Sequence, residues 1–263
     1  MISEEELRKI ARIKGLRLGY TEKDYLIDLC LLSISRRTGD ELVFKGGTCL
    51  YKFYKLDRFS EDIDFTLRKK LDINNLIKKI ISDLELFGID AKILSKKKFF
   101  NSYSVIIRTK GPLYKGTNQT LSQIRMDINT KSSINLEPLI AEYISIYSEI
   151  PKISLLIMNE KEILAEKIRA ILTRDKARDV YDLWFLLRKG VEFDLNLIKE
   201  KLKYYNEEWN KTKFLKKLLE KEKIWEIELK QLVRESPKFE EVLNVIKKAL
   251  KEKNQKFFIY PNT

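Results

Sequence analysis

Several reactive residue types are rare or absent in this chain. Its 263 residues include no histidine and only two cysteines, Cys30 and Cys49. The lack of histidine excludes Ser-His-Asp and Cys-His catalysis as well as histidine-ligated zinc. Two cysteines do not build a disulfide framework. Any chemistry therefore depends on carboxylates, lysines, hydroxyls and metal ions held by oxygen.

Long apolar runs are also lacking. The most apolar stretch, residues 25–34, is interrupted by Asp28, and no run reaches the roughly 18 residues that a membrane-spanning helix needs. The N-terminal residues do not resemble a signal peptide. With 44% hydrophobic and 35% charged residues, the composition is typical of a folded domain. We therefore expect a cytoplasmic protein that makes no contact with a membrane.

The charge is strongly unbalanced. Lysine and arginine total 52 against 39 acidic residues, a net charge of +13. Such an excess favours a polyanionic partner, either a nucleic acid or a nucleotide. The alternative is a solvated, lysine-rich surface. The excess extends into residues 195–257 and is not confined to a tail.

The hydrophobic periodicity predicts an α+β half followed by a helical half. Strands are expected at 42–45, 60–67, 91–96, 103–109 and 123–129, and helices at 2–13, 22–37, 48–56 and 74–87. After Pro138 the pattern is helical, at 160–173, 176–189 and 195–249. We expect an α+β domain of residues 1–138 and a helical domain of residues 139–263 that closes the active-site cleft. Residues 257–260 are expected to dock as a terminal segment.

A glycine pair marks the first candidate site. Gly46, Gly47 and Thr48 lie between a predicted strand and a predicted helix. Glycines at such a turn let backbone N–H groups approach a phosphate, and a helix N-terminus adds favourable charge. A purely structural turn is the alternative.

Three aspartates form the second candidate site. Asp62 and Asp64 alternate with apolar residues, so one face of the strand carries both carboxylates. Paired carboxylates repel each other unless a cation such as Mg²⁺ lies between them. Asp127 lies on the polar face of a later strand and would supply a third ligand for a two-metal site. Ordinary exposed acids are the alternative.

These motifs, in this order, resemble the polymerase-β-type nucleotidyltransferases. The string Lys45-Gly-Gly-Thr…Lys52…Arg58-Phe-Ser-Glu-Asp-Ile-Asp64 is similar to the AbiEii/AbiGii toxin family, which includes the MenT transferase toxins. The same family carries a lysine followed by a Lys-x-x-Asp-x-x-Asp motif, matched here by Lys167 and by Lys176, Asp179 and Asp182. The resemblance covers about residues 2–190.

The resemblance implies a function. The N-terminal domain would be a polymerase-β-like mixed sheet that transfers a nucleoside monophosphate from an NTP to an acceptor, with tRNA 3′ ends as the implied acceptor. Such a protein would act as the toxin of a type IV, AbiE-like system or in phage defence, with a cognate antitoxin. Asp62, Asp64 and Asp127 would bind Mg²⁺ or Mn²⁺, and Asp127 could act as the base. The implied catalytic set also includes Lys167 and Asp179. The implied nucleotide-binding residues are Lys45, Gly46, Gly47, Thr48, Lys52, Ser60, Lys176, Arg178 and Asp182.

A helical wheel tests the Lys167 position and the Lys-x-x-Asp-x-x-Asp motif independently of the resemblance. Lys167 falls inside the apolar arc of its helix and therefore requires an anionic partner or a polar cleft, which a triphosphate between the two halves would supply. The alternative is that the lysine snorkels to solvent or pairs with carboxylates such as Asp62. Asp179 lies at the edge of the apolar stripe of the next helix. Asp182 lies nearly opposite that stripe and is expected to cap the helix or to pair with Arg178 or Arg188.

Two other functions stay open. One is a non-catalytic nucleotide- or RNA-binding regulator, against which the three intact aspartates argue. The other is a small-molecule nucleotidyltransferase, for which the basic charge is unfavourable. The run from Lys96 to Phe100 is either a basic-aromatic patch or the tip of a β-hairpin.

Overall fold

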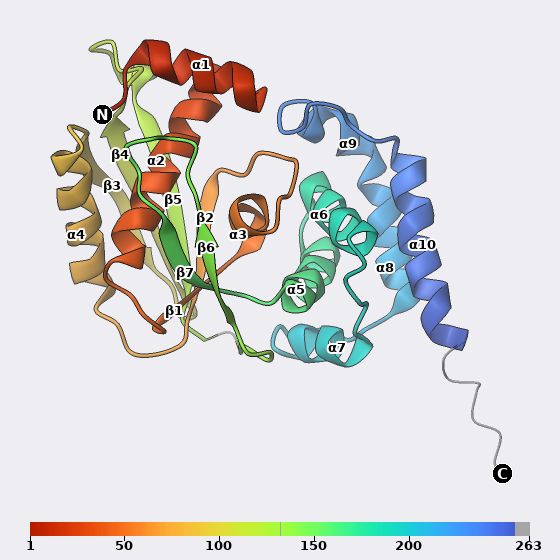
Figure 1. The fold of residues 1–263 in the computed structure, drawn as a ribbon. Helices are drawn as coiled ribbons and strands as arrows, with labels where there is room; N and C mark the ends of the chain where they lie inside the picture. The colour runs from red at the N-terminus through yellow and green to blue at the C-terminus, as the bar shows by residue number, and fades with distance from the viewer. Residues whose placement is uncertain (132, 256–263) are drawn as a thin grey trace. The chain divides into compact units, whose positions relative to one another are not determined.

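The computed structural model describes residues 1–131 and 133–255, with side chains up to 251. The chain divides into two compact units, residues Met1–Met158 and Asn159–Thr263, and each is described by itself (Figure 1). The expected terminal segment, residues 257–260, lies outside the described residues. No described helix is long and apolar enough to cross a membrane.

A seven-stranded mixed sheet forms the centre of the N-terminal unit within the described residues. Its order is β3-β4-β5-β2-β1-β7-β6. The bounds are β1 Leu42–Lys45, β2 Asp62–Leu67, β3 Asp90–Lys98, β4 Ser102–Lys110, β5 Ser122–Asn129, β6 Leu139–Tyr143 and β7 Ile153–Ile157. The pairs β2–β5 and β1–β7 are parallel, and the remaining pairs are antiparallel. The mixed sheet with helices confirms the predicted α+β class.

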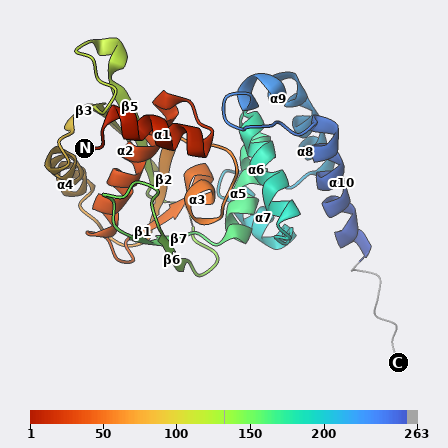
Figure 2. The same cartoon turned by 45° about the horizontal axis from the view of Figure 1, so that its top comes forward.

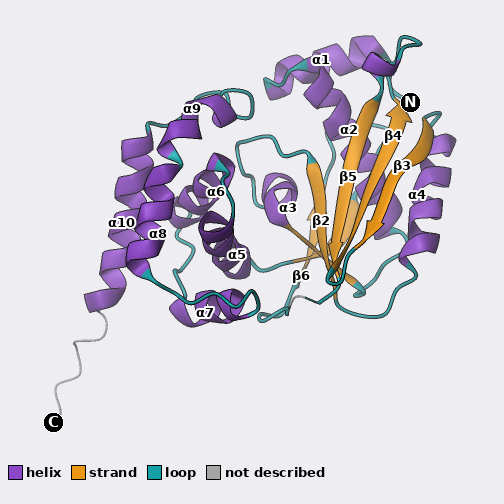
Figure 3. Cartoon of the chain, turned by 180° about the vertical axis from the view of Figure 1, so that it is seen from behind, coloured by secondary structure: helices purple, strands orange, loops and turns teal. Residues whose placement is uncertain are grey.

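Helices cover one face of this sheet. The N-terminal helices are α1 Glu4–Lys14, α2 Leu18–Ser35, α3 Gly46–Phe53 and α4 Ile73–Leu86. Helix α2 packs on β5 and β7, and α4 packs on β3. Figure 3 shows the strands β2, β5, β4 and β3 from the side opposite α2. On β5, Ile124, Met126 and Ile128 are buried, whereas Gln123 and Arg125, which alternate with them, are exposed. Period-two alternation therefore turns the apolar side chains toward the helices and the polar ones away.

The two compact units divide after Met158, later in the chain than the boundary expected at residue 138. Strands β6 and β7 belong to the sheet, because Phe44 on β1 pairs with Ile157 on β7 and β7 pairs with β6. The sequence pattern did not predict these two strands. They are only five residues long each, and runs of that length carry little periodic signal.

The C-terminal unit is helical, as predicted. Its helices are α5 Glu160–Thr173, α6 Ala177–Arg188, α7 Leu195–Lys203, α8 Lys211–Glu220, α9 Glu222–Leu229 and α10 Phe239–Gln255 (Figure 2). Helix α5 packs against α6, α7 and α8. Trp225 is 1% exposed, and its indole N–H donates to the Pro237 carbonyl over 2.8 Å. This satisfied tryptophan is part of the core of the unit.

Candidate active site

The glycine turn joins β1 directly to α3. Gly46 has a φ of +76°, and a Cβ at this position would lie 2.5 Å from Asp64 Oδ2. A Cβ on Gly47 would lie 2.6 Å from Arg58 Nη2 and 2.8 Å from Ser60 Oγ. Gly46 is therefore favoured both for backbone conformation and for space, and a side chain at position 47 would have to displace Arg58 or Ser60. The backbone of the turn consequently lies against the carboxylate of Asp64.

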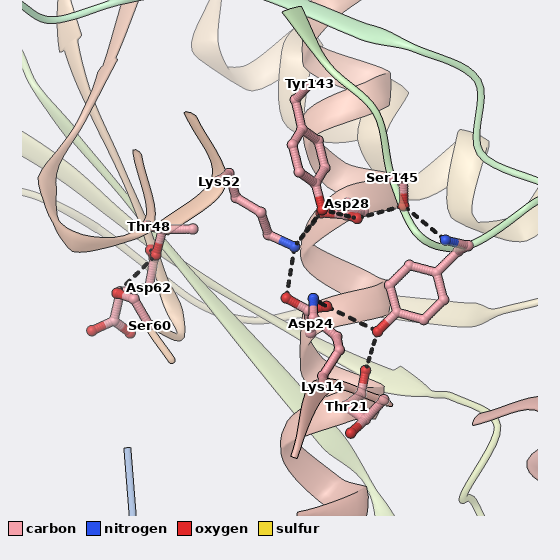
Figure 4. Close-up of polar contacts among 11 residues, drawn as sticks. Lys14, Thr21, Asp24, Asp28, Thr48, Lys52, Ser60, Asp62, Tyr143 and Ser145 are labelled. Atoms are coloured by element: carbon pink, nitrogen blue, oxygen red, sulfur yellow. Dashed lines mark hydrogen bonds and ion pairs between the residues drawn. The ribbon is translucent and has the colours of Figure 1, made fainter. Parts of the chain in front are cut away.

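Thr48 fastens the turn to the strand that carries the aspartates. Its side chain is completely buried. Thr48 Oγ1 lies 3.0 Å from Ser60 Oγ and also contacts the backbone carbonyl of Asp62 (Figure 4). The Thr48 hydroxyl is thus engaged within the protein. This geometry supports a bracing role for the hydroxyl and leaves the backbone of the turn as the candidate phosphate contact.

The three aspartates occupy neighbouring positions on two parallel strands. Asp64 on β2 is directly paired with Asp127 on β5, and Asp62 is paired with Arg125. On the other side of β2, Lys45 is paired with Asp64. Lys45, Asp64 and Asp127 therefore form one row across three strands that are about 4.8 Å apart. All three aspartates are partly exposed, so their oxygens can meet a ligand.

The donor set fits a divalent cation that is also held by its substrate. No three Asp, Glu, His or Cys side chains in the described part of the chain form a ready-made metal cage. Mg²⁺, however, is commonly bound through one or two carboxylates together with substrate phosphates. Asp62, Asp64 and Asp127 share a face beside the glycine turn, which suits that mode of binding.

Lys52 belongs to a buried ion cluster. Its Nζ lies 2.6 Å from Asp24 Oδ1 and 2.5 Å from Asp28 Oδ1, and its side chain is 1% exposed. Lys14 Nζ lies 2.5 Å from the second oxygen of Asp24. Ser145 Oγ donates to Asp28 Oδ2 over 2.6 Å (Figure 4). The expected phosphate contact of Lys52 is not supported by this position, because its ammonium group already faces two carboxylates.

Burial and charge act in opposite directions within this cluster. Burial alone would lower the pKa of Lys52, but Asp24 and Asp28 outweigh it and hold the pKa well above its usual value. Burial raises the pKa of Asp28, and the neighbouring Asp24 adds to the increase. The sequence offered one signal for the cluster, since Asp28 interrupts an apolar stretch and Asp24 lies one helical turn earlier.

Lys167 belongs to a second ion cluster, in the C-terminal unit. Its Nζ lies 3.0 Å from Asp179 Oδ1 and 2.7 Å from Asp182 Oδ2. Arg174 adds a bidentate pair to Asp179 over 2.7 and 2.8 Å. Burial would raise the pKa of Asp179, but Lys167 and Arg174 hold it well below its usual value. The inward lysine therefore has its anionic partners on the neighbouring helix.

Asp182 does not lie where the helical wheel places it. The side chain is fully buried and pairs with Lys167, a partner that the wheel did not predict; its expected pairing with Arg178 or Arg188 stays a prediction. Helix α6 packs against α5, α9 and α10, so its polar side is covered as well as its apolar stripe. Lys176 is exposed and lies 3.4 Å from Glu228, and Arg178 is half-buried.

Both the motifs and the fold agree with one known family. Residues 31–245 match the model of the nucleotidyl transferase AbiEii toxin of type IV toxin–antitoxin systems. The chain belongs to this family. It is therefore a nucleotidyltransferase, which confirms the predicted enzyme class. Membership implies an NTP substrate and a cognate antitoxin. None of the curated proteins matches the chain.

Solved structures show the same fold. JHP933 from Helicobacter pylori is 23% identical, with a TM-score of 0.61 over 91% of this chain and 97% of that one. A putative nucleotidyltransferase from H. pylori is also 23% identical, with a TM-score of 0.62 over 90% and 97%. MenT4, a nucleotidyltransferase toxin from Mycobacterium tuberculosis, is 17% identical, with a TM-score of 0.66 over 95% and 88%. At identities of 17–23%, these structures show only that the AbiEii-family chain shares their fold.

Proposed function

We propose that this AbiEii-family protein transfers a nucleoside monophosphate from an NTP to the 3′ end of a tRNA, in a reaction that requires Mg²⁺ or Mn²⁺. The observation that carries the proposal is the row of Lys45, Asp64 and Asp127, with the glycine turn at its β1 end. The acceptor is taken from the family resemblance, and the net charge of +13 is consistent with it.

Different residues bind the phosphates, hold the divalent cation and accept the proton in the proposed reaction. The backbone of Gly46 and Gly47, helped by Lys45 and Ser60, binds the β- and γ-phosphates. Asp62, Asp64 and Asp127 hold the divalent cation, which supplies charge stabilisation at the phosphates. The 3′-hydroxyl oxygen of the acceptor forms a bond to the α-phosphorus while the bond from that phosphorus to the bridging oxygen breaks. Pyrophosphate leaves, and Asp127 accepts the proton of the hydroxyl.

The C-terminal residues enter the proposal through the resemblance. Lys167 and Asp179 are assigned catalytic roles, and Lys176, Arg178 and Asp182 are assigned to the nucleotide. Because Lys167 and Asp179 also form an ion cluster, their variants must be tested for stability as well as for transfer. The type IV toxin role, or a role in phage defence, would follow from loss of functional tRNA.

Incubation of the protein with each labelled NTP, Mg²⁺ and total tRNA tests the proposal. We expect the wild type to label tRNA and Asp127→Asn to do so about 10²- to 10⁴-fold more slowly, because the isosteric amide cannot accept the proton. Asp62→Ala should abolish labelling. Asp90→Asn is the matched control, since Asp90 is an exposed strand aspartate at the far edge of the same sheet.

Two results would contradict the proposal. If no NTP labels tRNA, tRNA is not the acceptor. If a protein or a small molecule is labelled instead, that molecule is the acceptor. Labelling that survives Asp62→Ala would reject the assigned carboxylates.

A further inference from the structure

The face of the sheet that turns away from α2 and α4 carries basic side chains beside the aspartates. Arg125 on β5 is paired with Asp62 and with Ile106 on β4. In the next row, Lys97 on β3 is paired with Ser104, which is paired with Asp127. Paired residues point to the same face of a sheet. Arg125 and Lys97 therefore share the face of the carboxylates.

Arg108 adds a third cation to this face. It lies on β4, two residues beyond Ile106, and is paired with Gln123. Its neighbours in the strand, Ile107 and Thr109, are buried on the helix side, whereas Arg108 is partly exposed. The Nε of Arg108 is buried and has no hydrogen-bond partner among the described residues. The guanidinium keeps its positive charge, and because the residue as a whole is partly exposed, the group can attract an anionic ligand.

Acidic side chains neutralise some of the basic residues in this unit, but not these three cations. Lys23 pairs with Glu61 and Lys110 pairs with Asp90. Within residues 1–131 and 133–251, no acidic side chain forms an ion pair with Arg125, Arg108 or Lys97. A set of cations without acidic partners, in line with the catalytic carboxylates, is an electrostatic footprint for a polyanion.

The geometry of the reaction indicates whether the three cations bind the NTP or the acceptor. The glycine turn lies on the β1 side of Asp64, whereas the three cations lie on β5, β4 and β3, on the other side. In an in-line displacement, the attacking hydroxyl and the leaving pyrophosphate lie on opposite sides of the phosphorus. If the triphosphate is bound at the glycine turn, the acceptor approaches from the β5 side. The cations are therefore placed for the acceptor.

The tip of the β3–β4 hairpin extends the same surface with exposed rings. Phe99 is 55% exposed and Phe100 is 83% exposed, and the ammonium of Lys131 lies 3.2 Å from the centre of the Phe100 ring. Phe99 follows two residues after Lys97, and its N–H donates to the Ser102 carbonyl. The run from Lys96 to Phe100 is thus both a hairpin tip and a basic-aromatic patch. Exposed rings beside cations are typical of surfaces that bind single strands by stacking.

We propose that this surface, formed by Arg125, Arg108, Lys97, Phe99 and Phe100, binds the acceptor as a single-stranded RNA end. The cations contact successive phosphates, and the rings stack on bases. The inference rests on the proposed function for its direction, but binding of RNA can be measured without any transfer.

A titration of a short fluorescein-labelled RNA single strand, at ionic strengths between about 0.05 and 0.2 M, tests the surface. We expect Arg108→Gln/Arg125→Gln to weaken binding and to reduce the slope of log affinity against log salt by about 1.4, or about 0.7 for each phosphate contact. Phe99→Ala/Phe100→Ala should weaken binding about 5- to 150-fold for each base that loses a stacking partner, with the slope unchanged. The matched control is Lys78→Gln/Lys79→Gln, which removes two exposed charges from α4 on the opposite face.

The outcomes test the RNA-binding surface independently of the proposed nucleotide transfer. RNA affinity that is equal in Arg108→Gln/Arg125→Gln and in the α4 control, with both folded by circular dichroism, would overturn the inference. A wild-type protein that binds no RNA, or that binds only a protein acceptor, would overturn it as well. If the wild type binds RNA through these residues yet transfers no nucleotide, the surface stands and the proposed function fails.

Discussion

At the scale of single residues, Gly46 shows how closely the backbone and the candidate catalytic groups are fitted. The residue adopts a left-handed conformation, and the carboxylate of Asp64 occupies the space that a Cβ would take. One position thus serves both the turn and the orientation of an aspartate. Any side chain here must move the carboxylate or the turn.

Gly46→Ala is expected to damage both stability and transfer. A left-handed alanine costs about 1–2 kcal/mol, and the displaced Asp64 carboxylate should slow transfer on the order of 10²-fold. Gly116→Ala is the matched control, because Gly116 has a φ of +83° and a Cβ added there would meet no atom within 4 Å. Urea unfolding and transfer assays compare the two variants. Equal transfer rates would show that Asp64 does not depend on the glycine.

At the scale of elements, the Lys52 cluster joins α3 to α2. Helix α3 begins with the glycine turn, and its Lys52 meets Asp24 and Asp28 on α2. Tyr147 donates to Asp24 over 2.9 Å and Ser145 donates to Asp28, so the loop after β6 takes part as well. The cluster therefore holds in place the helix whose first residues form the candidate phosphate contact.

Lys52→Met should destabilise the protein by about 3–5 kcal/mol, because the substitution leaves buried carboxylates without their cation. In the background of Asp28→Asn the same substitution should cost less, since one of the stranded charges is already gone. Urea unfolding of the two single variants and the double variant completes the cycle. If Lys52→Met costs the same in both backgrounds, Asp28 is not an energetic partner of Lys52.

At the scale of the whole molecule, each of the two units contains its own buried ion cluster. The Lys52 cluster lies in the N-terminal unit, and the Lys167 cluster lies in the C-terminal unit. In the second cluster the pKa of Asp179 is lower in the folded protein than in an unfolded chain. A group of this kind contributes stability above its unfolded pKa of about 3.9, and the contribution is lost as the pH falls toward the folded pKa.

The C-terminal unit should therefore lose stability in acid through Asp179. Asp179→Asn should cost about 3–5 kcal/mol near neutral pH, because Lys167 loses a buried partner. The variant should also show a smaller decline of stability as the pH falls below about 5. Glu220→Gln, which removes an exposed partner of Lys217, should change little. Urea unfolding from about pH 7 to pH 3 measures both effects; identical pH profiles for wild type and Asp179→Asn would contradict the assignment.

Much of the candidate site could be predicted from local patterns. The alternation around Asp62, Asp64 and Asp127 has a period of two and requires no knowledge of strand order. The glycine pair between a strand and a helix is equally local. The helical wheel did not predict the burial of Asp182 or its contact with Lys167, because a wheel assumes one covered face, whereas α6 is covered by α5, α9 and α10.

The sequence by itself therefore determined the chemistry: without histidine, the chain relies on carboxylates, and the spacing of its motifs identified the nucleotidyltransferase family. Only the tertiary structure decided which of these residues meet. It paired Asp64 with Asp127, buried Lys52 between Asp24 and Asp28, and brought β6 and β7 into the sheet. Local periodicity sets which way a side chain points, but partners distant in the sequence are set by strand order and packing, which no local pattern encodes.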